Sequence, residues 1–214
     1  MRRFKALLAK ERLTRAEAGN RAFDCVFCRP PDGALRQRWE TLRAERRHAA
    51  SNPVAQALLL SYRPEFGGSL WLVDAAGVRR SDVRLGARAV RTLEHAALLV
   101  SRELPALVAA PRVLDTWTVT GIATGGETVL DGDSFGLSLC LLAAADRLGL
   151  PSPPNVAATA IVDSDGALFP VGGLSAKLQV LNDWALGVDT VLVAASQTAE
   201  ATALARELGT SWQI

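Results

Sequence analysis

The feature that most constrains the fold of this 214-residue chain is a nearly continuous apolar run from Leu137 to Leu150. A helix that is apolar almost all round is typical of a protein interior. We therefore expect a buried helix over residues 134–148, with Ser134 at its exposed N-terminal end. Apolar residues make up 49% of the chain, so a chain of this length can bury a substantial core around that helix.

Short apolar runs alternate with longer helical patterns from about residue 52 to the end. Strands are predicted over residues 55–62, 69–74, 113–120, 156–162 and 190–193, with short pieces at 167–169 and 211–214. Helices are predicted over residues 87–103, 134–148, 174–186 and 198–208. Interleaved strands and helices predict an α/β or α+β domain.

The N-terminal quarter differs in charge from the rest of the chain. Residues 1–50 hold 13 basic and 6 acidic side chains, a net charge of +7, whereas residues 51–214 hold 11 and 16, a net charge of −5. Polar helices are predicted over residues 3–18 and 34–49, separated by a Pro-Pro-Asp-Gly break. The pattern predicts a basic helical extension at 1–53 and a folded domain at 54–214.

A basic segment of this kind can bind nucleic acid, an acidic partner or its own domain, although many charged helical faces are simply solvated. We expect a protein partner for residues 1–50, such as an unfoldase or a regulator, rather than nucleic acid. No apolar run is long enough to cross a membrane and no secretory signal is present, so a cytoplasmic protein is expected.

Metal and cofactor sites are weakly indicated. Cys25 and Cys28 have the spacing of half a structural zinc site, with His48 as a further donor, but a second cysteine pair is missing. Two ordinary thiols are the expected state, and whether they bind metal stays open. We expect neither a metal nor a cofactor at the functional site.

A glycine-rich turn, Asp131-Gly132-Asp133-Ser134-Phe135-Gly136, leads into the apolar helix. Serine at a helix start is most often an N-cap. The unpaired N–H groups of a helix start could instead stabilise the oxyanion that forms when a serine attacks a peptide carbonyl. The turn alone leaves both roles open.

Lysine is scarce, and one copy is conspicuous. Of 24 basic residues only Lys5, Lys10 and Lys177 are lysine. Lys177 shares a predicted helix face with Leu174 and Leu181. There its ammonium either extends to the surface or is desolvated, which lowers its pKa and makes the amine a base.

The two segments together resemble the proteolytic domain of Lon protease, whose motifs are Asp-Gly-Pro-Ser-Ala-Gly and Pro-(Val/Ile)-Gly-Gly-Leu-x-x-Lys. The second motif matches residues 170–177, and 43 positions (177 − 134) separate serine from lysine, as is usual in that family. Weaker similarities at residues 67–72, 156–159 and 187–193 extend the resemblance over roughly 54–214. The resemblance implies a Lon-type fold and a serine endopeptidase. It assigns Ser134 and Lys177 as a catalytic dyad, Thr159 as a lysine-positioning residue, and Gly132 and Asp133 as the oxyanion turn.

The chain departs from the family pattern in ways that bear on activity. Asp133 replaces the motif proline, where a carboxylate would oppose oxyanion formation, and Phe135 replaces alanine, where its bulk would reshape the substrate pocket. The family's Gly-Glu after the threonine is Ala160-Ile161 here. No phosphate-binding loop of an ATPase is present, so ATP hydrolysis by that route is not expected.

Two function classes remain. The first is an endopeptidase that acts on protein or peptide substrates through an acyl-enzyme. The alternative is a catalytically weak or inactive module that keeps the fold for interaction or regulation. Neither His48 nor His95 falls near the two motifs in sequence, which disfavours a Ser-His-Asp mechanism. Asp163 and Asp165 are predicted to lie in a hairpin turn. A homo-oligomer is left open.

Overall fold

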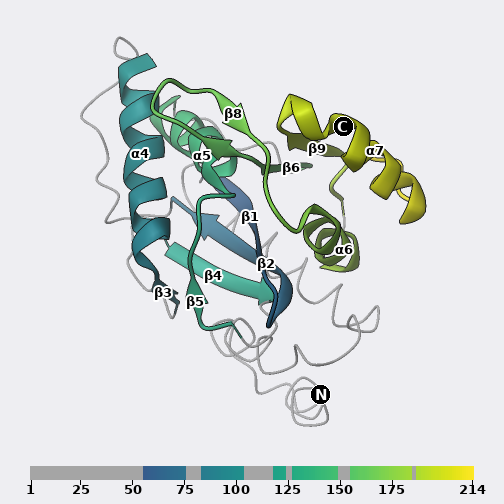
Figure 1. The fold of residues 1–214 in the computed structure, drawn as a ribbon. Coiled ribbons are helices and arrows are strands. Elements are labelled where there is room, and N and C mark those ends of the chain that lie inside the picture. Colours follow the sequence, from purple (N-terminus) through teal and green to yellow (C-terminus); the bar gives the residue numbers. More distant parts are fainter. Residues whose placement is uncertain (1–54, 76–82, 104–117, 124–126, 149–154, 185–186) are drawn as a thin grey trace.

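A three-stranded antiparallel sheet forms the centre of the molecule, as the computed structural model in Figure 1 shows. The structure describes residues 55–75, 83–103, 118–123, 127–148, 155–184 and 187–214. The strands are β1 (Gln56–Arg63), β2 (Gly67–Asp74) and β4 (Thr118–Ala123), in the order β1-β2-β4. Helices pack against this sheet, so the predicted mixed α/β class is confirmed. The predicted N-terminal helices, Cys25, Cys28 and His48 lie outside the described residues.

Both faces of the β1–β2 hairpin are buried, which explains its continuous apolar sequence. Successive side chains of a strand point to opposite faces of the sheet. Leu58 and Leu60 therefore join one core cluster, whereas Leu59 and Trp71 join another on the opposite face. Burial on both sides explains why these strands do not alternate between apolar and polar residues.

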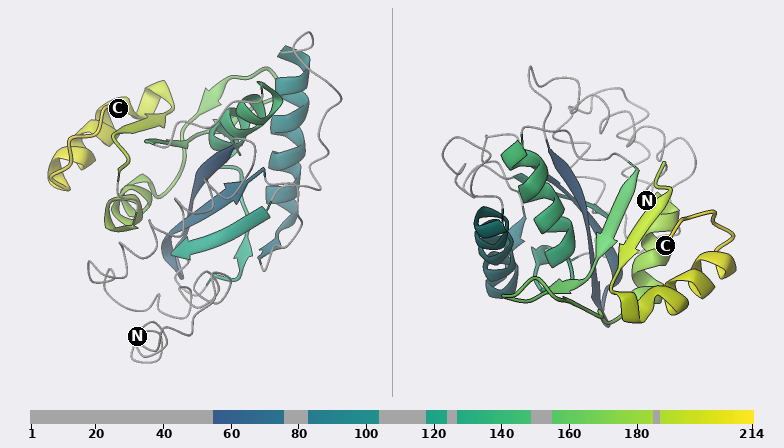
Figure 2. Two further views of the ribbon diagram at one scale, coloured as in Figure 1. Left: turned by 180° about the vertical axis from the view of Figure 1, so that it is seen from behind. Right: turned by 90° about the horizontal axis from the view of Figure 1, so that it is seen from above.

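Helices α4 (Ala87–Glu103) and α5 (Gly136–Leu148) lie side by side and cover one face of the sheet (Figures 1 and 2). The expectation that α5 is buried all round is wrong: Leu141 and Leu148 are 40% and 38% exposed. Contacts with α4, β1 and β6 (Val156–Thr159) cover only one side of the helix. The helix also begins at Gly136, two residues later than predicted.

The C-terminal part covers the other face of the sheet. Helix α6 (Leu174–Trp184) packs on β1 and β2, and β6 pairs in parallel with β9 (Thr190–Val193). The short 3₁₀ helix η3 (Ala195–Gln197) and α7 (Thr198–Glu207) follow. The predicted strand at 211–214 contributes only one bridge, from Thr190 to Gln213.

The side chain of Gln197 connects η3 to the loop that precedes α6. Its Oε1 accepts a hydrogen bond from the Val171 N–H at 2.7 Å, and its Nε2 donates to the Val171 carbonyl at 3.0 Å. Both residues are buried. The side-chain amide of Gln197 thus satisfies both the N–H and the carbonyl of Val171, as the backbone of a neighbouring strand would.

The predicted strand over 156–162 is divided into β6 and β7 (Ile161–Val162), which pairs with β8 (Leu168–Phe169). The strand breaks at Ala160, whose carbonyl accepts a hydrogen bond from the Leu137 N–H in α5 at 3.2 Å. The predicted hairpin turn is confirmed: Asp163 Oδ1 accepts hydrogen bonds from the N–H groups of Asp165 and Ala167, both at 2.9 Å.

A parallel pair of very short strands was not predicted. Strand β3 (Arg84–Leu85) pairs with β5 (Val129–Leu130), and two residues are too few to give a periodic pattern. The strand predicted at 113–120 is described only from Thr118, where β4 begins. In the part of the chain that the structure describes, no helix is long and apolar enough to cross a membrane.

Candidate functional site

The turn that carries Ser134 depends on two glycines. Gly132 has a φ of +130°, a backbone conformation that residues with a side chain rarely adopt. Gly136 begins α5 in close contact with β7, where a Cβ atom would lie 3.1 Å from the Val162 nitrogen. The sequence Gly-Asp-Ser-Phe-Gly therefore reverses direction and brings the start of α5 against β7.

Hydrogen bonds on two sides hold Ser134 in place. Its hydroxyl donates to the Leu60 carbonyl of β1 at 3.1 Å, so it does not act as an N-cap of α5. Its own carbonyl accepts a hydrogen bond from the Thr159 hydroxyl at the end of β6, at 3.0 Å. Ser134 is half-buried between these two strands.

Lys177 is buried, with 1% of its surface exposed. It lies on the same side of α6 as Leu174, Leu178 and Leu181, which pack against the sheet. Burial lowers the pKa of the Lys177 amine from 10.5 to about 8, and the Asp133 carboxylate opposes this shift. Within the described residues the amine makes no hydrogen bond or ion pair, so the charge of Asp133 alone favours its protonated form there.

Helix α6 packs closely against the backbone of β2. Gly68 of β2 contacts α6 so tightly that a Cβ atom at this position would overlap the Ala176 carbonyl. Because Ala176 immediately precedes Lys177, the absent side chain at Gly68 lets the lysine approach the sheet.

The serine turn is linked to Lys177 by an electrostatic effect and not by a hydrogen bond between the serine and the lysine. The charge of the Asp133 carboxylate acts on the Lys177 amine and raises its pKa, against the larger effect of burial. The Ser134 hydroxyl donates to Leu60, and the Thr159 hydroxyl donates to Ser134. In this structure neither hydroxyl is hydrogen-bonded to Lys177.

The two residues that replace the motif proline and alanine point in different directions. Phe135 is fully buried in the core with Leu130, Leu139 and Leu142. The core takes up the bulk of Phe135, so this side chain does not itself face a surface pocket. Asp133 is exposed, and its electrostatic effect reaches Lys177.

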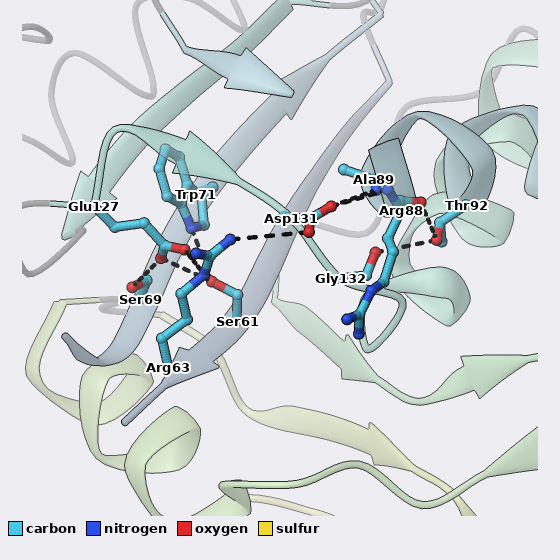
Figure 3. A network of polar contacts seen from close by, with 10 residues as sticks. All are labelled: Ser61, Arg63, Ser69, Trp71, Arg88, Ala89, Thr92, Glu127, Asp131 and Gly132. Carbon is cyan, nitrogen blue, oxygen red and sulfur yellow. Dashed lines mark hydrogen bonds and ion pairs between the residues drawn. The ribbon is translucent and has the colours of Figure 1, made fainter. Parts of the chain in front are cut away.

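A buried carboxylate that was not predicted from the sequence lies just before β5, next to Ser69 and Arg63 (Figure 3). Glu127 is 3% exposed and accepts a hydrogen bond from Ser69 at 2.9 Å. Its Oε1 faces Arg63 Nε at 2.6 Å, without a hydrogen bond of good geometry among the described residues. Burial raises the pKa of Glu127, while Ser69 and Arg63 oppose the rise. Because Glu127 belongs to no motif and lies in a polar stretch, only the topology reveals it.

Asp131 joins this network to α4 and to the serine turn. Its Oδ1 accepts hydrogen bonds from the N–H groups of Arg88 and Ala89 at 2.9 and 3.2 Å, which caps α4. Its Oδ2 lies 4.0 Å from Arg63 Nη2. Burial would raise the pKa of Asp131, but its backbone hydrogen bonds outweigh burial and lower it. The first residue of the motif thus fixes the turn to the start of α4 (Figure 3).

A pocket of about 250 Å³ lies on the α4 side of the turn, where Asp133 and Gly136 form part of its wall. His95 lines it as well, so this histidine lies closer to the serine turn than its sequence position indicated. Its Nε2 lies 2.8 Å from the Asp163 carbonyl and therefore donates a hydrogen there. Cys140 also lines the pocket, but burial raises the pKa of its thiol to about 11, which disfavours the reactive thiolate.

No group of three or more histidine, cysteine and carboxylate residues in the described ranges is arranged to hold a metal ion. The sequence matches no model of a known protein family and no curated protein.

Proposed function

We propose that the protein is a serine endopeptidase in which Lys177 is the general base for Ser134, on a fold of the Lon proteolytic type. The observation that carries this proposal is the buried Lys177 amine, with a pKa of about 8 and no hydrogen bond or ion pair among the described residues. Half of such an amine is in the neutral form at pH 8, whereas an ordinary lysine is almost wholly protonated there.

In the proposed mechanism the Ser134 hydroxyl first leaves the Leu60 carbonyl and donates to Lys177 Nζ. Lys177 takes the proton as Oγ bonds to the substrate carbonyl carbon, which gives a tetrahedral oxyanion. The lysine then protonates the leaving amine, the C–N bond breaks, and an acyl-enzyme remains. A water that gives its proton to Lys177 attacks the ester, and Ser134 recovers its hydrogen from the lysine as the acid product leaves.

The oxyanion needs N–H donors at the turn. The N–H groups of Gly136 and Leu137 already donate to the carbonyls of Asp133 and Ala160. We therefore assign the oxyanion to the preceding turn around Gly132 and Asp133, with the Ser134 N–H as a further donor. The exposed Asp133 carboxylate would have to point away from the oxyanion, since their like charges repel.

One observation favours the alternative, an inactive module for interaction or regulation. The Ser134 hydroxyl is engaged with Leu60 and not with Lys177, so the arrangement described is not the reactive one. In this second candidate the serine is a structural contact between α5 and β1, and the buried lysine has no catalytic partner.

Hydrolysis of casein and of unfolded peptides by the purified full-length protein, with and without ATP, separates the two candidates. Ser134→Ala and Lys177→Ala should each abolish cleavage. Ser175→Ala, which removes an exposed serine from the first turn of α6, should leave cleavage unchanged. Cleavage that survives in Ser134→Ala, or no cleavage of any unfolded substrate by the wild-type protein, would reject the peptidase proposal.

The proposal extends to the setting of the enzyme. Its substrates are unfolded proteins or peptides, and a separate unfoldase or regulator contacts residues 1–50. We propose a cytoplasmic location, with assembly into a homo-oligomer left to measurement. Neither a cofactor nor a metal enters the mechanism.

A further inference from the structure

The pocket beside the serine turn has an excess of positive charge on one of its walls. Arg88, Arg91, Thr92 and His95 line it from α4. They are spaced by three, four and seven residues from the first, so they share one face of the helix. The opposite wall comes from Asp133, the start of α5 and β7.

The two guanidinium groups have no acidic partner in the part of the chain that the structure describes. Both arginines are exposed, and no ion pair or side-chain hydrogen bond involves either of them there. Asp131 contacts Arg88, but it accepts a hydrogen bond from the backbone N–H of Arg88 and makes no ion pair with its guanidinium. In Figure 3 the Arg88 side chain extends past Gly132 without an ion pair to the acidic residues drawn.

We propose that this pocket binds the carboxylate of an acidic side chain in a bound peptide. Arginine presents N–H donors in a planar fork that fits a carboxylate, and the Thr92 hydroxyl adds a polar atom to the same wall. The volume of about 250 Å³ is below that of pockets for drug-sized ligands and suits one side chain with a few waters. Among the described residues of the lining, Asp133 is the only acidic one, so the two arginines exceed it in charge.

The choice of a peptide as the ligand rests on the proposed function. Asp133 forms part of the pocket wall and also acts on the Lys177 amine, so the pocket adjoins the proposed catalytic groups. A chain whose scissile bond lies at Ser134 could therefore place a nearby side chain between α4 and α5. The pocket would then select substrates with glutamate or aspartate near the cleaved bond.

Peptide binding to full-length Ser134→Ala protein tests the pocket without turnover. Two fluorescein-labelled peptides of alternating sequence, Glu-Ala and Gln-Ala, are compared by anisotropy. We expect the glutamate peptide to bind about tenfold more tightly. A charge-assisted hydrogen bond is stronger than a neutral one, and the difference in free energy corresponds to about tenfold in affinity. Replacing both arginines, with Arg88→Gln and Arg91→Gln, should remove the preference. Arg206→Gln, which removes an exposed arginine from α7 away from α4, should keep it (Figure 1).

Charge reversal gives a second readout that a folding defect would not produce. Arg91→Glu should weaken binding of the glutamate peptide and strengthen binding of a Lys-Ala peptide of the same length.

Equal binding of the Glu-Ala and Gln-Ala peptides, or an equal loss of preference in Arg206→Gln, would overturn the proposal. If wild-type protein cleaves casein but no acidic preference exists, the pocket proposal alone fails. If the preference exists but nothing is cleaved, the peptidase proposal fails and the carboxylate site remains.

Discussion

Lys177 shows how two opposing effects at one residue set the chemistry of a site. Burial favours the neutral amine, and the Asp133 carboxylate favours the charged form. Burial is the larger effect, so the pKa falls to about 8. A base with this pKa is partly neutral near physiological pH and can still take a proton from a hydroxyl.

In the proposed peptidase, activity should rise with pH through about 8, because the protonated amine below this value cannot accept the serine proton. Lys177→Arg should be as inactive as Lys177→Ala, since guanidinium keeps its proton. Initial rates of peptide cleavage across the pH range measure both effects. Full activity of Lys177→Arg would exclude lysine as the base.

Asp133→Asn should move the midpoint of this pH profile to a lower pH. The substitution removes the carboxylate that raises the pKa of Lys177, so neutral amine forms at lower pH. Asp183→Asn is the matched control, because Asp183 lies on α6 yet does not act on the pKa of Lys177. An unchanged midpoint in Asp133→Asn would show that the carboxylate does not reach the amine.

Sequence alone could predict part of this residue-scale chemistry. The spacing of Leu174, Lys177 and Leu181 placed the lysine on the core-facing side of α6, where the structure buries it. It could not choose between a surface-directed ammonium and a desolvated amine, because that depends on how deeply α6 packs. The motif also could not predict that the Phe135 side chain points into the core, because the geometry of the turn decides which neighbour of Ser134 is buried.

At the scale of secondary structure elements, the Glu127 network links three pieces that carry the site. Glu127 precedes β5, Arg63 ends β1, and Asp131 caps α4 at the start of the serine turn. One cation therefore lies between two carboxylates that belong to different elements. The network holds the turn in a fixed relation to the sheet.

The buried Glu127 should make the protein less stable as pH rises from 4.5 toward its raised pKa. In that window the folded state binds the proton more tightly than the unfolded state, so deprotonation favours unfolding. Glu127→Gln does not titrate and should lack this part of the pH dependence. Denaturant unfolding at a series of pH values, compared between the two proteins, measures the difference. Parallel stability curves would contradict the raised pKa.

Gly68→Ala should destabilise the protein by about 1–3 kcal/mol, the usual cost of overpacking a tight contact. The added methyl group would meet the Ala176 carbonyl, and α6 must move for it to fit. Gly172→Ala, where a Cβ atom has open space, is the control and should change stability much less. Thermal and denaturant unfolding of both variants test the contact. Equal stability of Gly68→Ala and wild type would show that α6 adjusts freely.

The sequence predicted the long elements better than their connections. Helix α4 was predicted with its observed bounds, because its apolar face repeats over 17 residues. Strands β3 and β5 and the division between β6 and β7 were missed. Each depends on a contact between distant segments, such as the Leu137 N–H with the Ala160 carbonyl, that no local pattern encodes.

For the whole molecule, charge separates an N-terminal segment of net +7 from a remainder of net −5. Deleting residues 1–50 should therefore change partner binding, assembly or substrate delivery while the cleavage of short peptides persists. Size-exclusion chromatography with light scattering, peptide hydrolysis and casein hydrolysis compare the two forms. Identical behaviour of both forms in assembly, partner binding and proteolysis would rule out a role for the segment.

The hydrogen bonds between Gln197 and Val171 limit how fast the loop that precedes α6 can move. The buried Val171 amide hydrogen can reach water only when its bond to the Gln197 side chain opens. Val171 lies six positions before Lys177, on the segment that leads into α6. The opening rate of one glutamine side chain near the C-terminus therefore limits how often the segment ahead of the buried amine can be released.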